Sequence, residues 1–241
     1  MTLLLSSAPQ GELGTYPLGV EKPHMHKHQE LFDDRRAAGR KLAYVLSDAR
    51  YDLVLALPRG GVPVAYEVAA ALKLPLDVVI VRKIGAPGQP EIGLGAVVDG
   101  DPPQVLWTPD LLQIFQPSES YLEAEVQRQL SEITRRRQTY IGNQAPINVS
   151  ERHILLVDDG IATGGTAKAA ARALRQAGAA SVTLAVPVAP QSTLDELATE
   201  VDDLICLATP EPFIAVGLHY QDFTQTSDDE VISLLQKAHS L

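Results

Sequence analysis

The stretch 154–166, ILLVDDGIATGGT, constrains the fold more than any other part of the chain. Ile154 to Val157 is a short apolar run typical of a buried strand, and two adjacent carboxylates, Asp158 and Asp159, follow it directly. Small residues and hydroxyls come next, and an alanine-rich helical pattern then runs from Ala167 to Ala177. The sequence therefore predicts a strand, a tight turn and a helix in immediate succession.

Such a turn favours a phosphate group. The first backbone N–H groups of a helix have no partner inside it, and the helix dipole adds about half a positive charge there. Asp158 and Asp159 cannot face that phosphate, but they suit sugar hydroxyls or Mg²⁺. The pattern indicates a sugar phosphate, with hydroxyls at one end and the phosphate at the other. The alternative is an ordinary strand-to-helix turn with two solvated aspartates.

Two better-known phosphate motifs do not fit this turn. A Walker loop needs a lysine before its hydroxyl residue, whereas this chain has Gly164, Gly165 and Thr166 there. A dinucleotide fingerprint requires a GxGxxG spacing with an acid about 20 residues later, and the chain lacks that form.

Composition narrows the classes of partner. The formal net charge of −10 argues against a nucleic-acid partner, which would need a basic face. No apolar run approaches the ~18 residues that span a bilayer, and the first residues lack the basic region of a signal peptide. The single cysteine, Cys206, excludes an intrachain disulfide and fits a cytoplasmic location, with a buried structural role in its apolar run.

The chain alternates strand and helix signals. Apolar runs predict strands at 53–57, 76–81, 154–157, 182–186 and 204–207, and helical patterns occur at 29–46, 62–72, 167–177, 192–199 and 228–239. Apolar strands separated by helices predict a doubly wound α/β fold, with a mainly parallel sheet and helices on both faces. We expect one domain, 29–241, after an irregular extension, 1–28, in which His24, His26 and His28 form a loosely ordered tail rather than a metal site.

The segment 99–144 breaks this alternation. It is rich in proline and then contains a long polar helix, about 120–140, which Ser118 could cap. We interpret it as an insertion that forms a small helical and irregular hood. Arg135, Arg136 and Arg137 close the helix and are expected to be a solvated helix end, with an anion-binding rim as the alternative.

Two further segments carry candidate chemistry. In 57–65, LPRGGVPVA, Gly60 and Gly61 permit a sharp turn at the start of another helix, and Arg59 adds a cation. This predicts a second anion-binding turn, with a plain strand-to-helix turn as the alternative. Arg82 and Lys83 end an apolar strand, where cations normally need a partner.

These motifs together resemble one family. VDDGIATGGT is similar to the 5-phosphoribosyl-1-diphosphate (PRPP) signature of type I phosphoribosyltransferases, especially its adenine version. LPRGG resembles the family's pyrophosphate loop, which often holds a non-proline cis peptide, here near 58–60. VRKIGAPGQPEIGLGAV resembles the flexible catalytic loop. From about 32 to 235 the chain looks like a subgroup of predicted bacterial phosphoribosyltransferases whose acceptor is unassigned.

The resemblance implies Mg²⁺-dependent transfer of a phosphoribosyl group from PRPP to a nitrogen nucleophile. It implies catalytic roles for Lys83, Arg82, Asp158 and Asp159, the last two also as Mg²⁺ ligands, directly or through water. It implies that PRPP contacts Arg59, Gly60, Gly61, Asp158, Asp159, Gly160, Ala162, Thr163, Gly164, Gly165 and Thr166. The expected partners are PRPP and a small-molecule acceptor, without nucleic acid or membrane, and a homodimer is left open.

The acceptor is not defined by these residues. Ala162 stands where hypoxanthine-type relatives carry an aspartate, and the second lysine of the adenine-type loop is absent. Glu91 is a candidate substitute base, whereas His219 is expected to have a structural role. Two alternatives are a PRPP-binding regulator without turnover and a phosphoribosyl hydrolase or phosphorylase.

Overall fold

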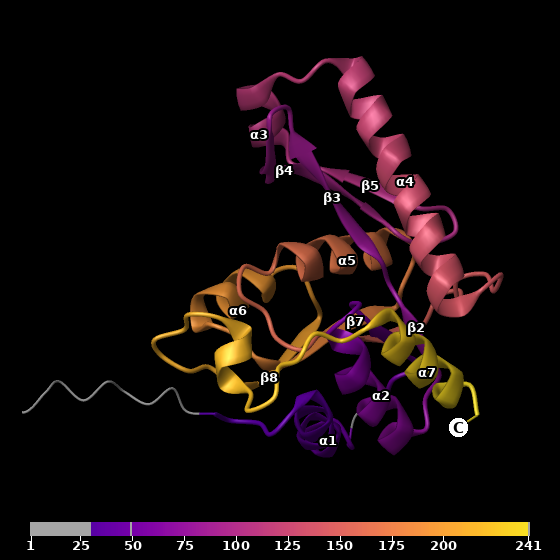
Figure 1. Cartoon of the computed structure of the whole chain (residues 1–241), viewed down its shortest axis with the longest axis vertical. Coiled ribbons are helices and arrows are strands. Elements are labelled where there is room, and N and C mark those ends of the chain that lie inside the picture. The colour runs from indigo at the N-terminus through magenta and orange to yellow at the C-terminus, as the bar shows by residue number, and fades with distance from the viewer. Residues whose placement is uncertain (1–29, 49, 241) are drawn as a thin grey trace, which may run out of the picture.

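The computed structural model describes residues 30–48 and 50–240, which form two sheets with helices around them (Figure 1). Our expectations for the extension 1–28, including its three histidines, lie outside the described residues.

The larger sheet has five parallel strands. Their order is β2 (Leu76–Val78), β1 (Leu53–Ala56), β6 (His153–Val157), β7 (Ser181–Val188) and β8 (Asp203–Ala208). The central strand β6 is flanked on both sides, and its four apolar residues 154–157 are fully buried. Continuous apolar strands of this kind need cover on both faces.

Helices supply that cover. The helices are α1 (Arg35–Val45), α2 (Gly61–Leu72), α5 (Gly165–Gln176), α6 (Gln191–Leu197) and α7 (Asp228–Ala238), with a short 3-10 turn, η1, at Val216–His219. Alternate residues of β1 enter different cores: Val54 packs with α1, α2 and α7, while Leu55 packs with α5 and α6. The predicted doubly wound α/β fold is confirmed. Helix α1 begins at Arg35 rather than at residue 29, because the Asp34 carboxylate accepts the Ala37 amide at 2.6 Å and caps it there.

The apolar run 76–81 forms two elements instead of the single predicted strand. Strand β2 ends at Val78, and the Val79 amide still donates to the Ala56 carbonyl at 3.0 Å. The Ile80 carbonyl instead accepts the Asp99 amide at 2.8 Å, so the chain leaves one sheet and enters the other. An apolar run has the same residue pattern in either sheet. Its sequence therefore could not show that the chain leaves one sheet for the other within this run.

The second sheet is antiparallel and consists of β3 (Val81–Ala86), β4 (Gln89–Val98) and β5 (Gln104–Trp107). With α3 (Pro109–Phe115) and α4 (Glu119–Ile141) it forms what we call the hood, which extends away from the larger sheet in Figure 1. The hood thus starts at Val81, earlier than the predicted insertion, and contains a sheet. The segment that resembles a flexible loop is the hairpin β3–β4, which turns at Gly88 with a φ of 71°.

Helix α4 matches its prediction, with Ser118 Oγ accepting the Tyr121 amide at 3.3 Å. The expectation for the three arginines at its end is wrong for Arg137. Arg135 and Arg136 pair with Glu132 near solvent, but Arg137 is 8 % exposed and pairs with Asp77 and Asp99. Consecutive residues of a helix point in directions about 100° apart, so adjacent arginines can have unlike environments.

Glu200, just after α6, holds α5 in place. Arg172 Nε and Lys168 Nζ of α5 lie 2.7 and 3.1 Å from its carboxylate oxygens. The hydrogen bond from Arg172, and then that from Lys168, lowers the pKa of Glu200 to about 2. The resulting stabilisation is present above the ordinary pKa and is lost as pH falls through the lowered value.

We expect Glu200→Gln to lower the free energy of unfolding at pH 7 by up to about 1 kcal/mol, because the pair is partly exposed. The difference in free energy of unfolding between the variant and the unmodified protein should become smaller as pH falls from about 4.5 toward 2. Denaturant unfolding at several pH values measures this, and a difference independent of pH would contradict it.

Within residues 30–48 and 50–240, no helix is both long and apolar enough to cross a bilayer. Cys206 lies half-buried on β8, where its thiol donates to the Ala208 carbonyl at 3.2 Å. Burial raises the pKa of this thiol, which disfavours the reactive thiolate and agrees with a structural role.

Candidate functional site

The acid pair lies at the carboxyl end of β6, the edge of a parallel sheet where ligands bind in open α/β folds. Gly160 follows the two aspartates. A Cβ at this position would come 2.5 Å from Val216 Cγ1 and 2.9 Å from Val188 Cγ1, so a larger residue does not fit. The backbone therefore passes close to Val188 and Val216 directly after Asp159.

The turn beyond the acids is held by the neighbouring elements. The Ile161 amide donates to the Val188 carbonyl at 2.9 Å, and the Thr193 hydroxyl donates to the Ala162 carbonyl at 2.8 Å. Gly164 has a φ of 72°, in the left-handed region that glycine adopts most readily, and it lies against Thr193 of α6. Strand β7 and helix α6 thus fix the turn's conformation.

The amides of this turn are available to a ligand. Within the described part of the chain, those of Thr163, Gly164, Gly165 and Thr166 donate to no protein group. They stand at the beginning of α5, where orphan N–H groups and the helix dipole favour an anion. The geometry meets the requirement of the predicted phosphate site, since protein acceptors do not occupy it.

The second glycine-rich turn lies against the first. The peptide between Pro58 and Arg59 is cis, as the resemblance implies. A Cβ on Gly60 would lie 2.0 Å from Asp159 Oδ2, and one on Gly61 would lie 3.0 Å from the Asp158 Cα. The structure therefore brings the acid pair and both predicted anion turns together at one edge of the sheet.

Arg35 also belongs to this site, although the sequence analysis missed it. Its Nε donates to Asp159 Oδ2 at 2.7 Å, and both side chains are close to nine-tenths buried. Arg35 is the first residue of α1, where the helix dipole disfavours a cation. The sequence analysis placed the start of this helix at residue 29, so the unfavourable position of Arg35 became visible only in the structure.

Burial dominates the electrostatics of the acid pair. Burial, and then the neighbouring Asp159 carboxylate, raises the pKa of Asp158 well above its ordinary range. Burial also raises the pKa of Asp159, but the hydrogen bond and charge of Arg35 oppose that rise. The two carboxylates are consequently inequivalent, and a bound cation would stabilise the charge that burial disfavours.

The predicted cations occupy different places. Arg59 directly precedes Gly60, which lies against Asp159, but its own side chain pairs with Asp228 at the start of α7, with Nη1 3.6 Å from Oδ1. Arg82 faces away, because its Nε donates to Gln129 of α4 at 3.0 Å, and burial followed by the charge of Arg136 lowers its pKa. The structure does not bring Arg82 to the acid pair.

Lys83 lies on the opposite face of β3 from Arg82, because side chains alternate along a strand. It is exposed, and its cross-strand neighbour Ala96 packs in the core that contains α5. Lys83 is thus on the hood face turned toward α5, the helix that begins at the candidate phosphate turn.

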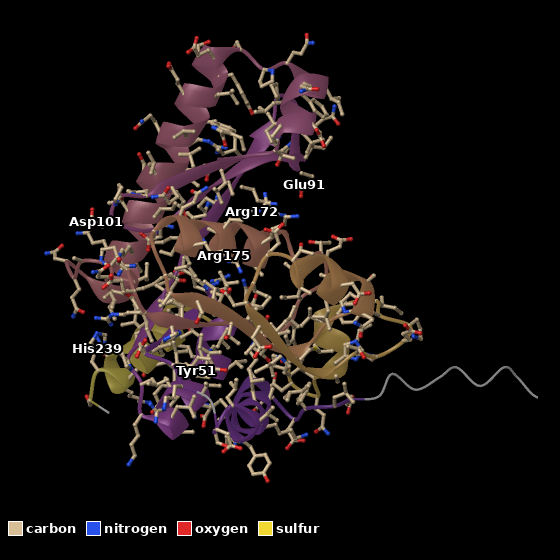
Figure 2. The ribbon with its side chains drawn as sticks, turned by 180° about the vertical axis from the view of Figure 1, so that it is seen from behind. Tyr51, Glu91, Asp101, Arg172, Arg175 and His239 are labelled. Atoms are coloured by element: carbon tan, nitrogen blue, oxygen red, sulfur yellow. The ribbon has the colours of Figure 1, made fainter. Side chains whose placement is uncertain are left out.

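The residues considered for the acceptor are less defined. Glu91 is exposed on β4, and Figure 2 shows it on the hood; no hydrogen bond or ion pair of the described residues joins it to the acid pair. Ala162 is exposed at the phosphate turn and offers no base. His219 is 2 % exposed and stacks on Phe213 with ring centroids 5.2 Å apart, which suits a structural role.

The described residues contain no group of three or more His, Cys, Asp or Glu side chains that could enclose a metal ion. The acid pair offers two carboxylates as oxygen ligands. This fits Mg²⁺, which proteins commonly hold through one or two carboxylates together with phosphate oxygens and water. Asp158 and Asp159 would hold such an ion in company with a phosphorylated ligand.

This combination of sheet, paired turns and acid pair defines the phosphoribosyltransferase class of α/β protein. Comparison with known families agrees, because residues 28–222 match the model of the phosphoribosyl transferase domain. The chain belongs to this family.

Three relatives extend the comparison. Two Mycobacterium tuberculosis proteins, "Putative phosphoribosyl transferase MT0597" and "Putative phosphoribosyl transferase Rv0571c", are each 46 % identical over 212 residues, covering 87 % of this chain and 47 % of theirs. The chain thus spans about half the length of these curated relatives. The crystal structure of TT1426 from Thermus thermophilus is 40 % identical, with a TM-score of 0.75, and covers 86 % of this chain and 98 % of that one.

Proposed function

We propose that this chain transfers the 5-phosphoribosyl group of PRPP to a nitrogen nucleophile of the nucleobase type and releases pyrophosphate. The observation that carries the proposal is the contact between the two anion turns, with a pair of acids between them. PRPP has the matching shape: a phosphate at one end, a pyrophosphate at the other and two ribose hydroxyls between.

The proposed contacts follow from this arrangement. The free amides of residues 163–166 would hold the 5-phosphate, and Asp158 and Asp159 would hold the ribose hydroxyls or Mg²⁺. Arg59 and the turn 60–61 would hold the pyrophosphate, with Lys83 as a counter-charge from the hood. Arg82 stays in the proposal only as a residue that supports β3 against α4.

Charge separation explains why these groups promote transfer. Breaking the bond between ribose C1 and the pyrophosphate oxygen leaves positive charge on the ribose and negative charge on the leaving group. In the proposed complex Arg59 and Lys83 would contact the leaving group and stabilise that negative charge, and preorganised contacts of this kind each contribute on the order of 10²-fold or more in rate. Bound Mg²⁺ would neutralise pyrophosphate charge.

The acceptor can be sought directly. The 241-residue chain, PRPP and Mg²⁺ are incubated with a panel of nucleobases, and released pyrophosphate is measured. Pyrophosphate release that requires one acceptor supports the proposal. PRPP loss without any acceptor would instead indicate a hydrolase, and tight binding without turnover would indicate a regulator.

The site itself has a separate test. We expect the double variant Asp158→Asn, Asp159→Asn to abolish Mg²⁺-dependent PRPP binding in calorimetry, because it removes both anionic oxygen ligands. Asp110→Asn, an exposed acid on α3, is the matched control and should bind as the unmodified protein does. Undiminished PRPP binding by the double variant would refute the site assignment.

A further inference from the structure

Arg35 is fixed against one member of the acid pair only. It is the first residue of α1, and the Asp34 cap holds that helix start in place. Its Nε donates to Asp159 Oδ2 at 2.7 Å, while its Nη1 donates to the Thr224 carbonyl at 2.8 Å. The guanidinium carbon also lies 3.8 Å from the centroid of the Phe223 ring. Three directional contacts leave this side chain little freedom.

The backbone of Asp159 is held from the same side. The Tyr220 hydroxyl donates to the Asp159 carbonyl, and the Tyr220 ring packs against Phe32 and Phe223 at 5.3 and 5.1 Å between centroids. The Phe32 amide donates to the carbonyl of residue 219, which joins the segment before α1 to the segment before α7. Asp159 is thus held by residues from the segment before α1 and the segment before α7.

Asp158 has a different environment. Among residues 30–48 and 50–240, no Lys or Arg forms a salt bridge with it, and its Oδ1 accepts the Asp159 amide at 2.8 Å. The Asp159 oxygen that pairs with Arg35, by contrast, is the one that touches the Gly60 turn. Asp159 is therefore already engaged on two sides by protein. Burial raises the pKa of Asp158 and the charge of Arg35 opposes that rise, but among the described residues Asp158 has no direct contact with a cation.

We propose that Arg35 is a positioning residue that gives the two acids of the pair different roles. It holds Asp159 chiefly as a brace beneath the pyrophosphate turn, and it leaves Asp158 as the acid that contributes more of the two to holding the ribose hydroxyls or Mg²⁺. This inference rests on the proposed function for its ligand, but it predicts an asymmetry that the proposed function does not. If Arg35 only tied α1 to the core, its loss would lower stability without distinguishing the two acids.

A double-mutant cycle on PRPP affinity tests the proposal, read by calorimetry with Mg²⁺ at fixed salt. Arg35→Met and Asp159→Asn should each weaken PRPP binding about 10-fold, and the two together should be no weaker than either alone. Asp158→Asn should remove detectable binding. Arg36→Met is the matched control, because this neighbour points to Glu67 with its Nε at 3.2 Å, and it should bind normally.

Two results would overturn the proposal. The first is additive losses in the cycle, which would mean that Arg35 does not act through Asp159. The second is an equal loss from Asp158→Asn and Asp159→Asn. Each variant's unfolding midpoint is measured beside its affinity, so that a fold defect is recognised.

A ligand-free measurement separates this inference from the proposed function. The Gly61 amide donates to the Leu57 carbonyl at 3.1 Å, so its hydrogen exchange reports on the turn. Arg35→Met should speed that exchange and Arg36→Met should not. If the unmodified protein fails to bind PRPP, the proposed function fails by itself. Unchanged exchange at residue 61 in Arg35→Met would then reject the bracing role independently.

Discussion

Replacing Arg137 by methionine should destabilise the protein by about 3 kcal/mol, the largest stability loss that we expect from a single substitution. Its Nη2 lies 2.9 Å from Asp77 Oδ2 and its Nη1 2.6 Å from Asp99 Oδ2, and all three side chains are more than nine-tenths buried. Removing the cation leaves two buried carboxylates unpaired. A cavity of about 630 Å³ borders these residues and admits water, which places the loss at the lower end of the ~3–5 kcal/mol range.

The stability lost in Arg137→Met should be smaller at lower pH. Burial already raises the pKa of Asp99, and Arg137 opposes that rise. Without Arg137 the folded-state pKa of this carboxyl rises further above its unfolded value, so its protonated form is favoured in the fold. The stability deficit of Arg137→Met should therefore shrink as pH falls through the raised pKa of Asp99, as measured by denaturant unfolding at several pH values.

Arg135→Met is the matched control, because the same residue type lies two positions earlier on the same helix. Its Nε is 2.8 Å from Glu132, but its side chain is 62 % exposed, and such surface pairs contribute less than about 1 kcal/mol. Equal losses for the two variants would show that the Arg137 cluster is not a buried ion pair. Adding Asp99→Asn to Arg137→Met should recover part of the stability.

The parallel sheet was predictable because its residues obey local rules. Buried strands are continuous apolar runs, and the acid pair and both glycine turns directly follow two of them. Parallel strands end at one edge, so the topology alone brings residues 58–61 and 158–166 together. The sequence therefore predicted where both turns lie in the fold, each between a parallel strand and a helix.

Contacts between distant segments were not predictable in this way. Arg35 meets Asp159 across 124 positions, and Arg137 meets Asp77 across 60, so no local pattern encodes either pair. The hood was also misread, because a hairpin whose turn contains Pro87 and Gly88 has the composition of a loop. Non-local ion pairs depend on the completed fold, and composition does not specify them.

Gly60→Ala should reduce PRPP-dependent turnover by about 100-fold or more, because it disrupts a contact on which the proposed leaving-group site depends. The added Cβ would stand 2.0 Å from Asp159 Oδ2, far inside van der Waals contact. Asp159 cannot easily move away from the added Cβ, since Arg35 holds its carboxylate and Tyr220 holds its carbonyl. The turn must move instead, at a cost of about 1–3 kcal/mol in stability, as for other overpacked sites.

A second substitution separates the steric effect from a general loss of folding. Asp159→Ala removes the carboxylate that a Cβ at residue 60 would strike, so in that background Gly60→Ala should lower stability far less than it does alone. Gly93→Ala is the control glycine for stability, because nothing outside its chain neighbours lies within 4 Å of its added Cβ, and its unfolding midpoint should stay unchanged. If Gly60→Ala had the same stability cost with and without the Asp159 carboxylate, the two turns would not be in contact. The single site that we propose for both ends of PRPP would then be excluded.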